Sequence, residues 1–250
     1  MKSKTVDAAS GKFGCLDRRT FFKLTSAAAT AAAFSGTLFG GLVYADALGK
    51  EKRDKMTPDE VLAALKLGNK NFIKGQMTTR NYRNEQKATV KGQFPAAVIL
   101  SCIDSRAPAE VILDLGIGDI FNARVAGNIT NEDVLGSLEF ACKVTGAKVV
   151  LVMGHTSCGA IKGAIDNVEL GNLTGLLAKI KPAVKATTFK GDLSSKNAAY
   201  VDAVAQKNVE LTIADIRKKS PVLAELESKG AIKIVGSMYN IETAVVDFYA

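Results

Sequence analysis

The chain has 250 residues and a formal net charge of +8, and 47% of its residues are hydrophobic while 23% are charged. This balance indicates a globular protein of one or two domains and excludes a disordered chain. No apolar run of the length that a membrane span needs, about 18 residues, lies beyond residue 50, which excludes a protein that crosses a membrane several times.

The N-terminus carries the pattern of an export signal. Arg18 and Arg19 precede the aromatic pair Phe21-Phe22 and a weakly apolar run over residues 24–44. A paired arginine ahead of such a run resembles a twin-arginine signal peptide, which directs folded proteins out of the cytoplasm. We therefore expect a periplasmic or otherwise exported protein, with the twin-arginine export machinery as a partner.

Small residues follow the apolar run and predict where the signal is removed. Ala45 and Ala47 allow cleavage after either residue. We expect residues 1–47 to be the signal peptide and residues 48–250 to form one domain. Residues 1–47 hold six basic and three acidic residues, so their removal lowers the net charge from +8 to +5. The remaining Lys and Arg residues form no dense block, and we expect no nucleic-acid partner.

Helical and strand-like patterns alternate through residues 48–250. Thr57, Pro58 and Glu60 have the spacing of a helix start, with an N-cap, a first-turn proline and a capping-box glutamate. Short continuous apolar runs are typical of strands that are buried on both faces. The pattern predicts an α/β fold with a mostly parallel central sheet flanked by helices. In chain order, we expect a helix over 57–74, a polar loop to 92, a strand over 96–100, a short helix over 107–115, a strand over 120–125, a helix over 132–145, a strand over 148–153, helices between 158 and 229, a strand over 232–235 and a last segment over 243–248.

Chemically active side chains follow two of the expected strands. The first buried strand runs into Cys102, Asp104 and Arg106, and the third runs into His155 and Cys158. In open α/β sheets, ligands bind at the carboxyl ends of the strands. Cysteine and histidine are preferred zinc ligands, and two cysteines with one histidine leave a fourth position open for chemistry. The two segments therefore predict a zinc site.

Other interpretations of these residues stay open. The expected domain keeps Cys102, Cys142 and Cys158, and an odd number of cysteines in an exported protein argues against a simple set of disulfides. Cys102 and Cys158 can still form a disulfide or be small buried apolar residues, and His155, the sole histidine, can be a core residue. Cys142 lies on an apolar helical face, so we interpret it as a buried side chain without a chemical role.

The two motifs have the same order and flanking residues as those of a known family. They read Cys-x-Asp-Ser-Arg at residues 102–106 and Gly-His-x-x-Cys-Gly at residues 154–159. Together they resemble the β-class carbonic anhydrases. The resemblance covers roughly residues 57–248 and includes Arg124–Asn128, Ser137–Ala141 and Gly236–Ile241.

The resemblance implies a metal site and a catalytic pair. One Zn²⁺ per chain is expected to bind to Cys102, His155 and Cys158. Asp104 and Arg106 correspond to the catalytic pair of the family. An arginine fork can keep a carboxylate off the metal, so that Asp104 orients the reactive water; in a closed state, Asp104 is instead a possible fourth ligand.

Four further residues match substrate-binding positions of the family. Gln93 corresponds to a glutamine that donates to bicarbonate, Phe121 to an aromatic wall and Gly159 to a glycine beside the metal. Phe140 falls where many relatives carry tyrosine, so the hydroxyl is missing at this position. The resemblance implies that these four residues line the pocket.

The resemblance also implies an activity. A carbonic anhydrase, a lyase, uses zinc to hydrate carbon dioxide reversibly to bicarbonate and a proton. Hydrolysis of carbon disulfide or carbonyl sulfide on the same scaffold and non-catalytic periplasmic zinc binding stay open. A thiol redox protein is disfavoured, because the chain has no Cys-x-x-Cys pair. The family builds its pocket across a dimer interface, so we expect a homodimer or a higher homo-oligomer, with the helix from Pro58 as a candidate for wrapping the partner.

Overall fold

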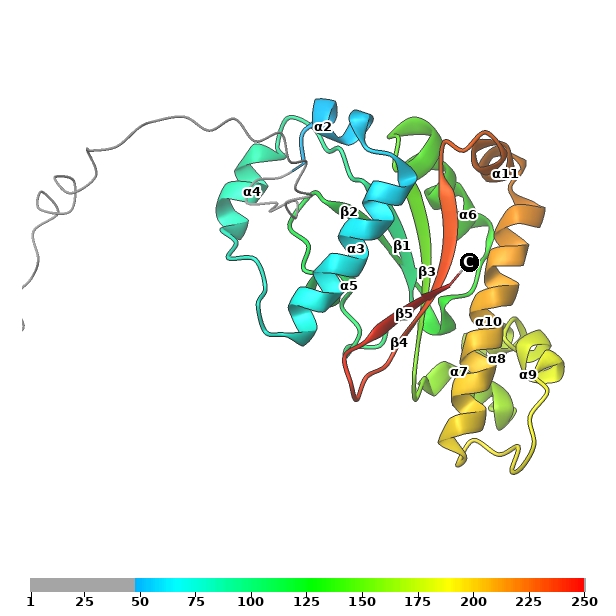
Figure 1. The fold of residues 1–250 in the computed structure, drawn as a ribbon. Coiled ribbons are helices and arrows are strands. Elements are labelled where there is room, and N and C mark those ends of the chain that lie inside the picture. The colour runs from blue at the N-terminus through cyan, green and yellow to red at the C-terminus, as the bar shows by residue number, and fades with distance from the viewer. Residues whose placement is uncertain (1–47, 250) are drawn as a thin grey trace, which may run out of the picture. The chain divides into compact units, whose positions relative to one another are not determined.

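The computed structural model describes residues 48–249, and the expected export signal lies outside these residues. Five strands form one sheet with the order β2-β1-β3-β4-β5, in which all neighbours are parallel except the antiparallel pair β4–β5 (Figure 1). The expected α/β fold with a mostly parallel sheet is confirmed. The strands are β1 (Ala97–Ser101), β2 (Ile120–Arg124), β3 (Val149–His155), β4 (Lys233–Tyr239) and β5 (Val246–Tyr249).

Helices cover both faces of the sheet (Figure 1). On one face of the sheet, apolar side chains of the strands pack against α3 and α5. On the other face, they pack against α6, α10 and α11. No helix in the part of the chain that the structure describes is long and apolar enough to cross a membrane. The helices are α2 (Lys50–Lys55), α3 (Pro58–Ile73), α4 (Tyr82–Ala88), α5 (Ala109–Ile112), η1 (Ala126–Asn128), α6 (Glu132–Glu139), η2 (Phe140–Val144), α7 (Gly159–Ile165), α8 (Gly171–Ala178), α9 (Lys181–Ala186), α10 (Ala198–Lys219) and α11 (Pro221–Ser228).

β1 and β3 lie at the centre of the sheet and are fully buried. Ile99 of β1 packs into the layer with α3, and its neighbour Leu100 packs into the layer with α10. Burial on both faces explains why both strands read as continuous apolar runs. The parallel register pairs Ser101 with Met153. The segments that follow the two strands therefore leave the same edge of the sheet side by side.

α3 begins where the sequence predicts. The Thr57 hydroxyl accepts the backbone N–H of Glu60, and the Glu60 carboxylate accepts the backbone N–H of Thr57, which closes the capping box. Val61 and Leu65 on this helix are buried in the core. The capping pattern of the sequence therefore predicts the start of the helix, and the spacing of its apolar residues predicts the buried face.

The buried face of α3 packs on its own chain. The Asn69 amide donates to the carbonyls of Ile112 and Ala244, and its oxygen accepts the N–H of Val246. These three bonds tie α3 to α5 and to the start of β5. This chain's own sheet therefore covers one face of α3, while Leu67 and Ile73 on the same helix are exposed; the expectation that the helix from Pro58 wraps a partner subunit stays a prediction.

The segment expected to be a polar loop contains a helix, α4. Asn81 caps it by accepting the N–H of Asn84. Glu85 turns inward, with a side chain only 2% exposed, and pairs with Arg80. An ion pair rather than an apolar stripe holds this helix against the domain, so hydrophobic periodicity did not predict it.

Three further elements differ from their expected lengths. The expected helix over residues 132–145 is divided, because a π-helical turn follows α6 and the N–H of Thr145 bonds to the carbonyl of Phe140. β3 and β4 extend beyond their apolar runs to His155 and Tyr239, because these two residues are paired in the sheet. Backbone pairing rather than side-chain hydrophobicity sets these ends.

Candidate metal centre

Three potential metal ligands meet at the carboxyl ends of β1 and β3. The Sγ atoms of Cys102 and Cys158 and a ring nitrogen of His155 lie within 4.8 Å of one another, and the two Sγ atoms are 4.0 Å apart. Cys102 follows β1, His155 ends β3 and Cys158 is the N-cap of α7. All three residues are at most 4% exposed. The structure thus brings together the three residues that the sequence nominates as zinc ligands.

A sharp turn follows His155 at the end of β3 and leads into Cys158. Ser157 has a φ of 56°, in the left-handed region that few non-glycine residues adopt. Its N–H donates to Asp202 Oδ1 of α10 at 2.9 Å, and this bond stabilises the turn. Cys158 is thereby placed beside Cys102.

His155 is oriented as a metal ligand. Its Nδ1 atom lies 2.9 Å from the carbonyl oxygen of Thr156; because a carbonyl only accepts, Nδ1 carries the proton and Nε2 carries the lone pair. Nε2 is buried and has no hydrogen-bond partner among the described residues. A buried lone pair without a partner is costly, and metal-bound histidines commonly donate their other N–H to a carbonyl. The residues therefore fit a bound metal ion.

The two thiols of the cluster differ in their electrostatic surroundings. The pKa of Cys102 lies well below its usual value, because the hydrogen bond from Cys158, the neighbouring His155 ring and the N–H of Gly127 together outweigh the effect of burial. The pKa of Cys158 is raised, because its proton is held in the bond to Cys102 and because it is buried beside that charge. Metal ligation requires thiolates, so a cation in the cluster stabilises the second negative charge.

The side chains of Asn208 and Arg124 hold the backbone around Cys102 in place, and the sequence alone did not assign either of them to the site. The N–H of Gly127 lies 3.3 Å from Cys102 Sγ, and Asn208 of α10 fixes this loop by donating to the Gly127 carbonyl at 2.7 Å. Arg124 donates to the backbone carbonyls of Cys102 and Asp104 at 2.9 and 2.6 Å. The sequence signal for Asn208 is a polar residue on the buried face of α10.

Asp104 is held in a fork by Arg106. The guanidinium donates from Nε to Oδ1 at 3.0 Å and from Nη2 to Oδ2 at 2.8 Å, and the backbone N–H of Arg106 donates to Oδ1 at 2.9 Å. These bonds hold the pKa of the Asp104 carboxyl well below its usual range. Oδ2 also lies 3.8 Å from His155 Nε2. A charged carboxylate therefore faces the cluster without belonging to it.

Comparison with known proteins identifies the family. A family model described as carbonic anhydrase matches residues 97–246, which include the cluster and the fork. Carbonic anhydrase 2 of Mycobacterium tuberculosis is 34% identical over 185 residues, which cover 72% of this chain and 86% of the relative. The carbonic anhydrase of Mycolicibacterium smegmatis is 33% identical over 186 residues, which cover 74% of this chain and 89% of the relative. The chain belongs to the carbonic anhydrase family.

Solved structures show the same fold and point to the β class of the carbonic anhydrases. A β-carbonic anhydrase of Sordaria macrospora has a TM-score of 0.55 and 25% identity, over 63% of this chain and 82% of that chain. A β-carbonic anhydrase of Aspergillus fumigatus has a TM-score of 0.57 and 25% identity, over 65% and 79%. Membership of this family makes the protein a carbonic anhydrase, which is a lyase.

The expected substrate-binding residues are divided between the two ends of β1. Gly159 is exposed and directly follows the cluster. Gln93 is also exposed, but it precedes β1 whereas Cys102 follows it. A strand rises about 3.3 Å per residue, so Gln93 and the cluster lie at opposite ends of the strand. Within one chain of this carbonic anhydrase, Gln93 does not reach the cluster.

The two aromatic residues of the expected pocket pack on each other rather than on the cluster. Phe121 of β2 is level with Val98 of β1, near the start of that strand. Its ring meets that of Phe140 edge to face, with the centroids 6.1 Å apart. Phe140 is 48% exposed. The pair therefore forms an apolar surface of this carbonic anhydrase away from its own cluster.

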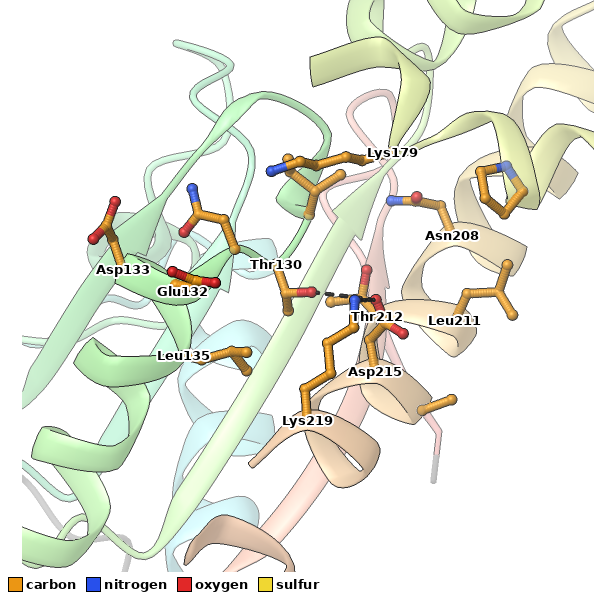
Figure 2. Close-up of a pocket in the computed structure, with 14 residues that line it drawn as sticks. Thr130, Glu132, Asp133, Leu135, Lys179, Asn208, Leu211, Thr212, Asp215 and Lys219 are labelled. Carbon is orange, nitrogen blue, oxygen red and sulfur yellow. Dashed lines mark hydrogen bonds and ion pairs between the residues drawn. The ribbon is translucent and has the colours of Figure 1, made fainter. Parts of the chain in front are cut away.

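A hollow of about 770 Å³ lies between the start of α6 and α10 (Figure 2). Its wall includes Thr130 and the ion pair of Asp215 with Lys219, joined at 2.6 Å. None of the cluster residues lines it. The wall of the hollow also includes Asn208, whose amide donates to the backbone carbonyl of Gly127. Thr212 in the wall donates to the same loop, at the carbonyl of Asn128. The hollow is thus separate from the candidate metal centre of this carbonic anhydrase.

Replacing Cys158 by serine is expected to lower the bound metal well below one ion per chain. A hydroxyl is a far weaker zinc donor than a thiolate, and the two remaining ligands hold the ion poorly. Elemental analysis of the purified variant measures this. Cys142→Ser is the control, because burial raises the pKa of Cys142 to about 12 and this thiol packs among apolar side chains. Full metal occupancy in Cys158→Ser would contradict its assignment as a ligand.

Proposed function

We propose that the chain catalyses the zinc-dependent, reversible hydration of carbon dioxide to bicarbonate and a proton, with one Zn²⁺ per chain held by Cys102, His155 and Cys158. The observation that carries the proposal is the buried Nε2 of His155, which has no hydrogen-bond partner among the described residues and lies with two thiols within 4.8 Å. Two thiolates and an imidazole are a donor set suited to zinc. Family membership supplies the reaction.

Zinc, when bound, acts as a Lewis acid that makes a water molecule acidic enough to serve as the nucleophile at neutral pH. The contribution of this chain to that step comes from Asp104. Oδ1 accepts two bonds from Arg106 and Oδ2 accepts only one. Oδ2 therefore keeps a free lone pair, and it is the oxygen that faces the cluster. There it accepts a hydrogen bond from the attacking water and orients it toward carbon dioxide.

The proton released by the reaction has to leave without a second imidazole. His155 is the sole histidine of the chain and is committed to the metal. The low pKa of Asp104 makes this carboxylate a poor carrier of protons at neutral pH. We infer that water and external buffer carry the proton away from the site.

We further propose that the active unit is a homodimer or a higher homo-oligomer in which a partner subunit completes each pocket. Gln93 lies at the far end of β1 from its own cluster, and the pair Phe121–Phe140 forms a partly exposed apolar surface. These residues serve as amide donor and aromatic wall when they face the cluster of another subunit. The Sordaria macrospora enzyme is described as tetrameric, which supports assembly in this family.

Arg106→Ala is expected to keep zinc but to slow carbon dioxide hydration about 100-fold, the scale of losing an electrostatic orienting group. Without its counter-charge, the Asp104 carboxylate turns toward the nearby cation. Stopped-flow hydration and zinc content are measured on the same preparation. Arg83→Ala on α4 is the control, because Arg83 is exposed and bonds only to Gln86 among the described residues.

Asp104→Asn tests the acceptor itself. An amide is a weaker acceptor than a carboxylate, so zinc is expected to stay bound while the hydration rate falls to a similar extent. Near wild-type turnover in either Arg106→Ala or Asp104→Asn would show that this pair does not gate the reaction.

Mixed oligomers test whether Gln93 acts on a partner's site. Gln93→Ala chains keep zinc but lack the amide, and Cys158→Ser chains lack zinc but keep the amide. Co-expression with two different tags and purification on both yields mixed oligomers. In a mixed dimer, one of two sites has both elements, so activity is expected to recover to about half of the wild type. Recovery no greater than the average of the two parent variants would show that Gln93 serves its own chain or no site.

We also propose that residues 1–47 are a twin-arginine leader that takes the folded protein to the periplasm. The pair Arg18-Arg19 ahead of a weakly apolar run supports this. Replacing both arginines by lysine is expected to hold the precursor in the cytoplasm, as fractionation and blotting measure. Normal export of the double-lysine variant would contradict the proposal.

A further inference from the structure

A buried cluster of charged side chains lies at the edge of the sheet opposite the candidate metal centre. Asp119 directly precedes β2, and its carbonyl accepts the N–H of Ala96, just before β1. Arg80 Nη1 lies 3.6 Å from the Asp119 carboxylate and 3.3 Å from that of Glu85, and Arg80 Nε lies 4.0 Å from that of Asp114. All four charged side chains are at most 4% exposed. Within residues 48–249, three carboxylates thus surround one guanidinium.

Asp119 is the least satisfied of the three carboxylates. Asp114 accepts bonds from Thr78 and Asn71. Asp119 Oδ2 accepts the N–H of Gly116 at 2.7 Å, but Oδ1 is buried and makes no hydrogen bond of ordinary geometry with the described residues. Burial raises the pKa of the Asp119 carboxyl, and the charge of Glu85 adds to this effect. A further positive charge at this position would stabilise the carboxylate.

The first described residue lies against this carboxylate. The backbone N–H of Leu48 is near enough to the Asp119 carboxylate to lower its pKa slightly. The Leu48 side chain is 4% exposed, in the same core cluster as Ala96, whose N–H bonds to the Asp119 carbonyl, and Leu115, which precedes Gly116. The next helix, α2, is anchored by Arg53, which is buried and donates to the carbonyls of Pro95 and Thr145. The nitrogen of Leu48 is thus fixed by the folded domain.

The sequence places a processing site at this nitrogen. Ala45-Asp46-Ala47 has the small-x-small pattern recognised by leader peptidases, and Leu48 is the next residue. We propose that the leader is cut between Ala47 and Leu48 and that the new α-ammonium group of Leu48 pairs with Asp119 inside the buried cluster. Hydrolysis of this one peptide bond consumes one water, leaves the carboxylate on Ala47 and turns the Leu48 amide into an amine that is protonated at neutral pH.

Cutting at this bond changes the electrostatics of the cluster. The amide of the precursor offers Asp119 one neutral N–H, whereas an ammonium offers three donors and a positive charge. A buried carboxylate with too little counter-charge is costly, and a close cation reduces that cost. Cleavage after Ala45 would instead leave Leu48 as an amide and keep the acidic residue Asp46 two positions before it in the chain. The precursor folds with the amide in place, and cleavage after Ala47 stabilises it further.

The cut site is tested on the protein exported by a bacterium with a twin-arginine pathway. The proposal rests on the proposed leader but not on the carbonic anhydrase activity. Intact mass of the envelope fraction is expected to show Leu48 as the first residue. A chain that begins at Asp46, or one that stays uncut, would overturn the proposal. Fractionation of the same cells reports export separately, and zinc content and hydration rate report the enzyme separately.

The ion pair is tested on two zinc-loaded chains released from a removable N-terminal fusion. One begins at Leu48 and the other at Ala47, so they differ by one residue and by the position of the ammonium. The chain that begins at Leu48 is expected to melt about 5 °C higher, the shift of one charge-assisted buried contact in a domain of this size. Equal melting temperatures would overturn the proposal.

Substitution of the carboxylate assigns the effect to Asp119. With Asp119→Asn in both chains, the difference in melting temperature is expected to vanish, whereas Asp133→Asn, at an exposed position on α6, is expected to preserve it. A difference that survives Asp119→Asn would contradict the pairing. If Asp119→Asn does not fold, acylation of the Leu48 amine decides: a buried ion pair reacts many times more slowly than the amine of the unfolded chain, and equal rates would overturn the proposal.

Discussion

The pairing of β1 with β3 is the constraint on which the site depends. Their parallel register sets Ser101 beside Met153, so that Cys102 and His155 emerge at the same edge of the sheet. A slip of one residue would displace Cys102 by about 3.3 Å relative to His155. Zinc ligands tolerate errors of only a few tenths of an ångström. The two apolar layers that bury these strands therefore also hold the geometry of the donor atoms.

The negative charges near the cluster are divided between two kinds of partner. Arg106 holds the Asp104 carboxylate, whereas the chain provides no guanidinium or ammonium in direct contact with the two thiols within the described residues. Without a cation, Cys102 and Cys158 share a proton. In the site that we propose, the protein thus neutralises the carboxylate of Asp104 and leaves the two thiolates to be neutralised by a metal ion. This division explains why a carboxylate can lie 3.8 Å from His155 Nε2 without being part of the ligand set.

Local patterns in the sequence predict most of the fold and the centre of the site. The apolar runs predict the buried strands, and the strand ends predict that Cys102, His155 and Cys158 come together. Asn208 was not predicted, because its role depends on a contact with Gly127, distant in sequence. α4 was missed for a similar reason, since Glu85 is held by buried charges rather than by an apolar stripe. In the assembly that we propose, the positions of Gln93 and Phe121 relative to a site depend on a second subunit, which one chain's sequence pattern does not place.

We propose that bound zinc and the residues around it enable this chain to hydrate carbon dioxide. The most direct measurement is stopped-flow carbon dioxide hydration by the processed protein, first stripped of metal by a chelator and then titrated with Zn²⁺. We expect negligible activity without metal, and activity that rises linearly with added Zn²⁺ and levels off at one Zn²⁺ per chain. Hydration that is unaffected by the loss of metal, or a zinc-replete protein that hydrates no carbon dioxide, would contradict this proposal.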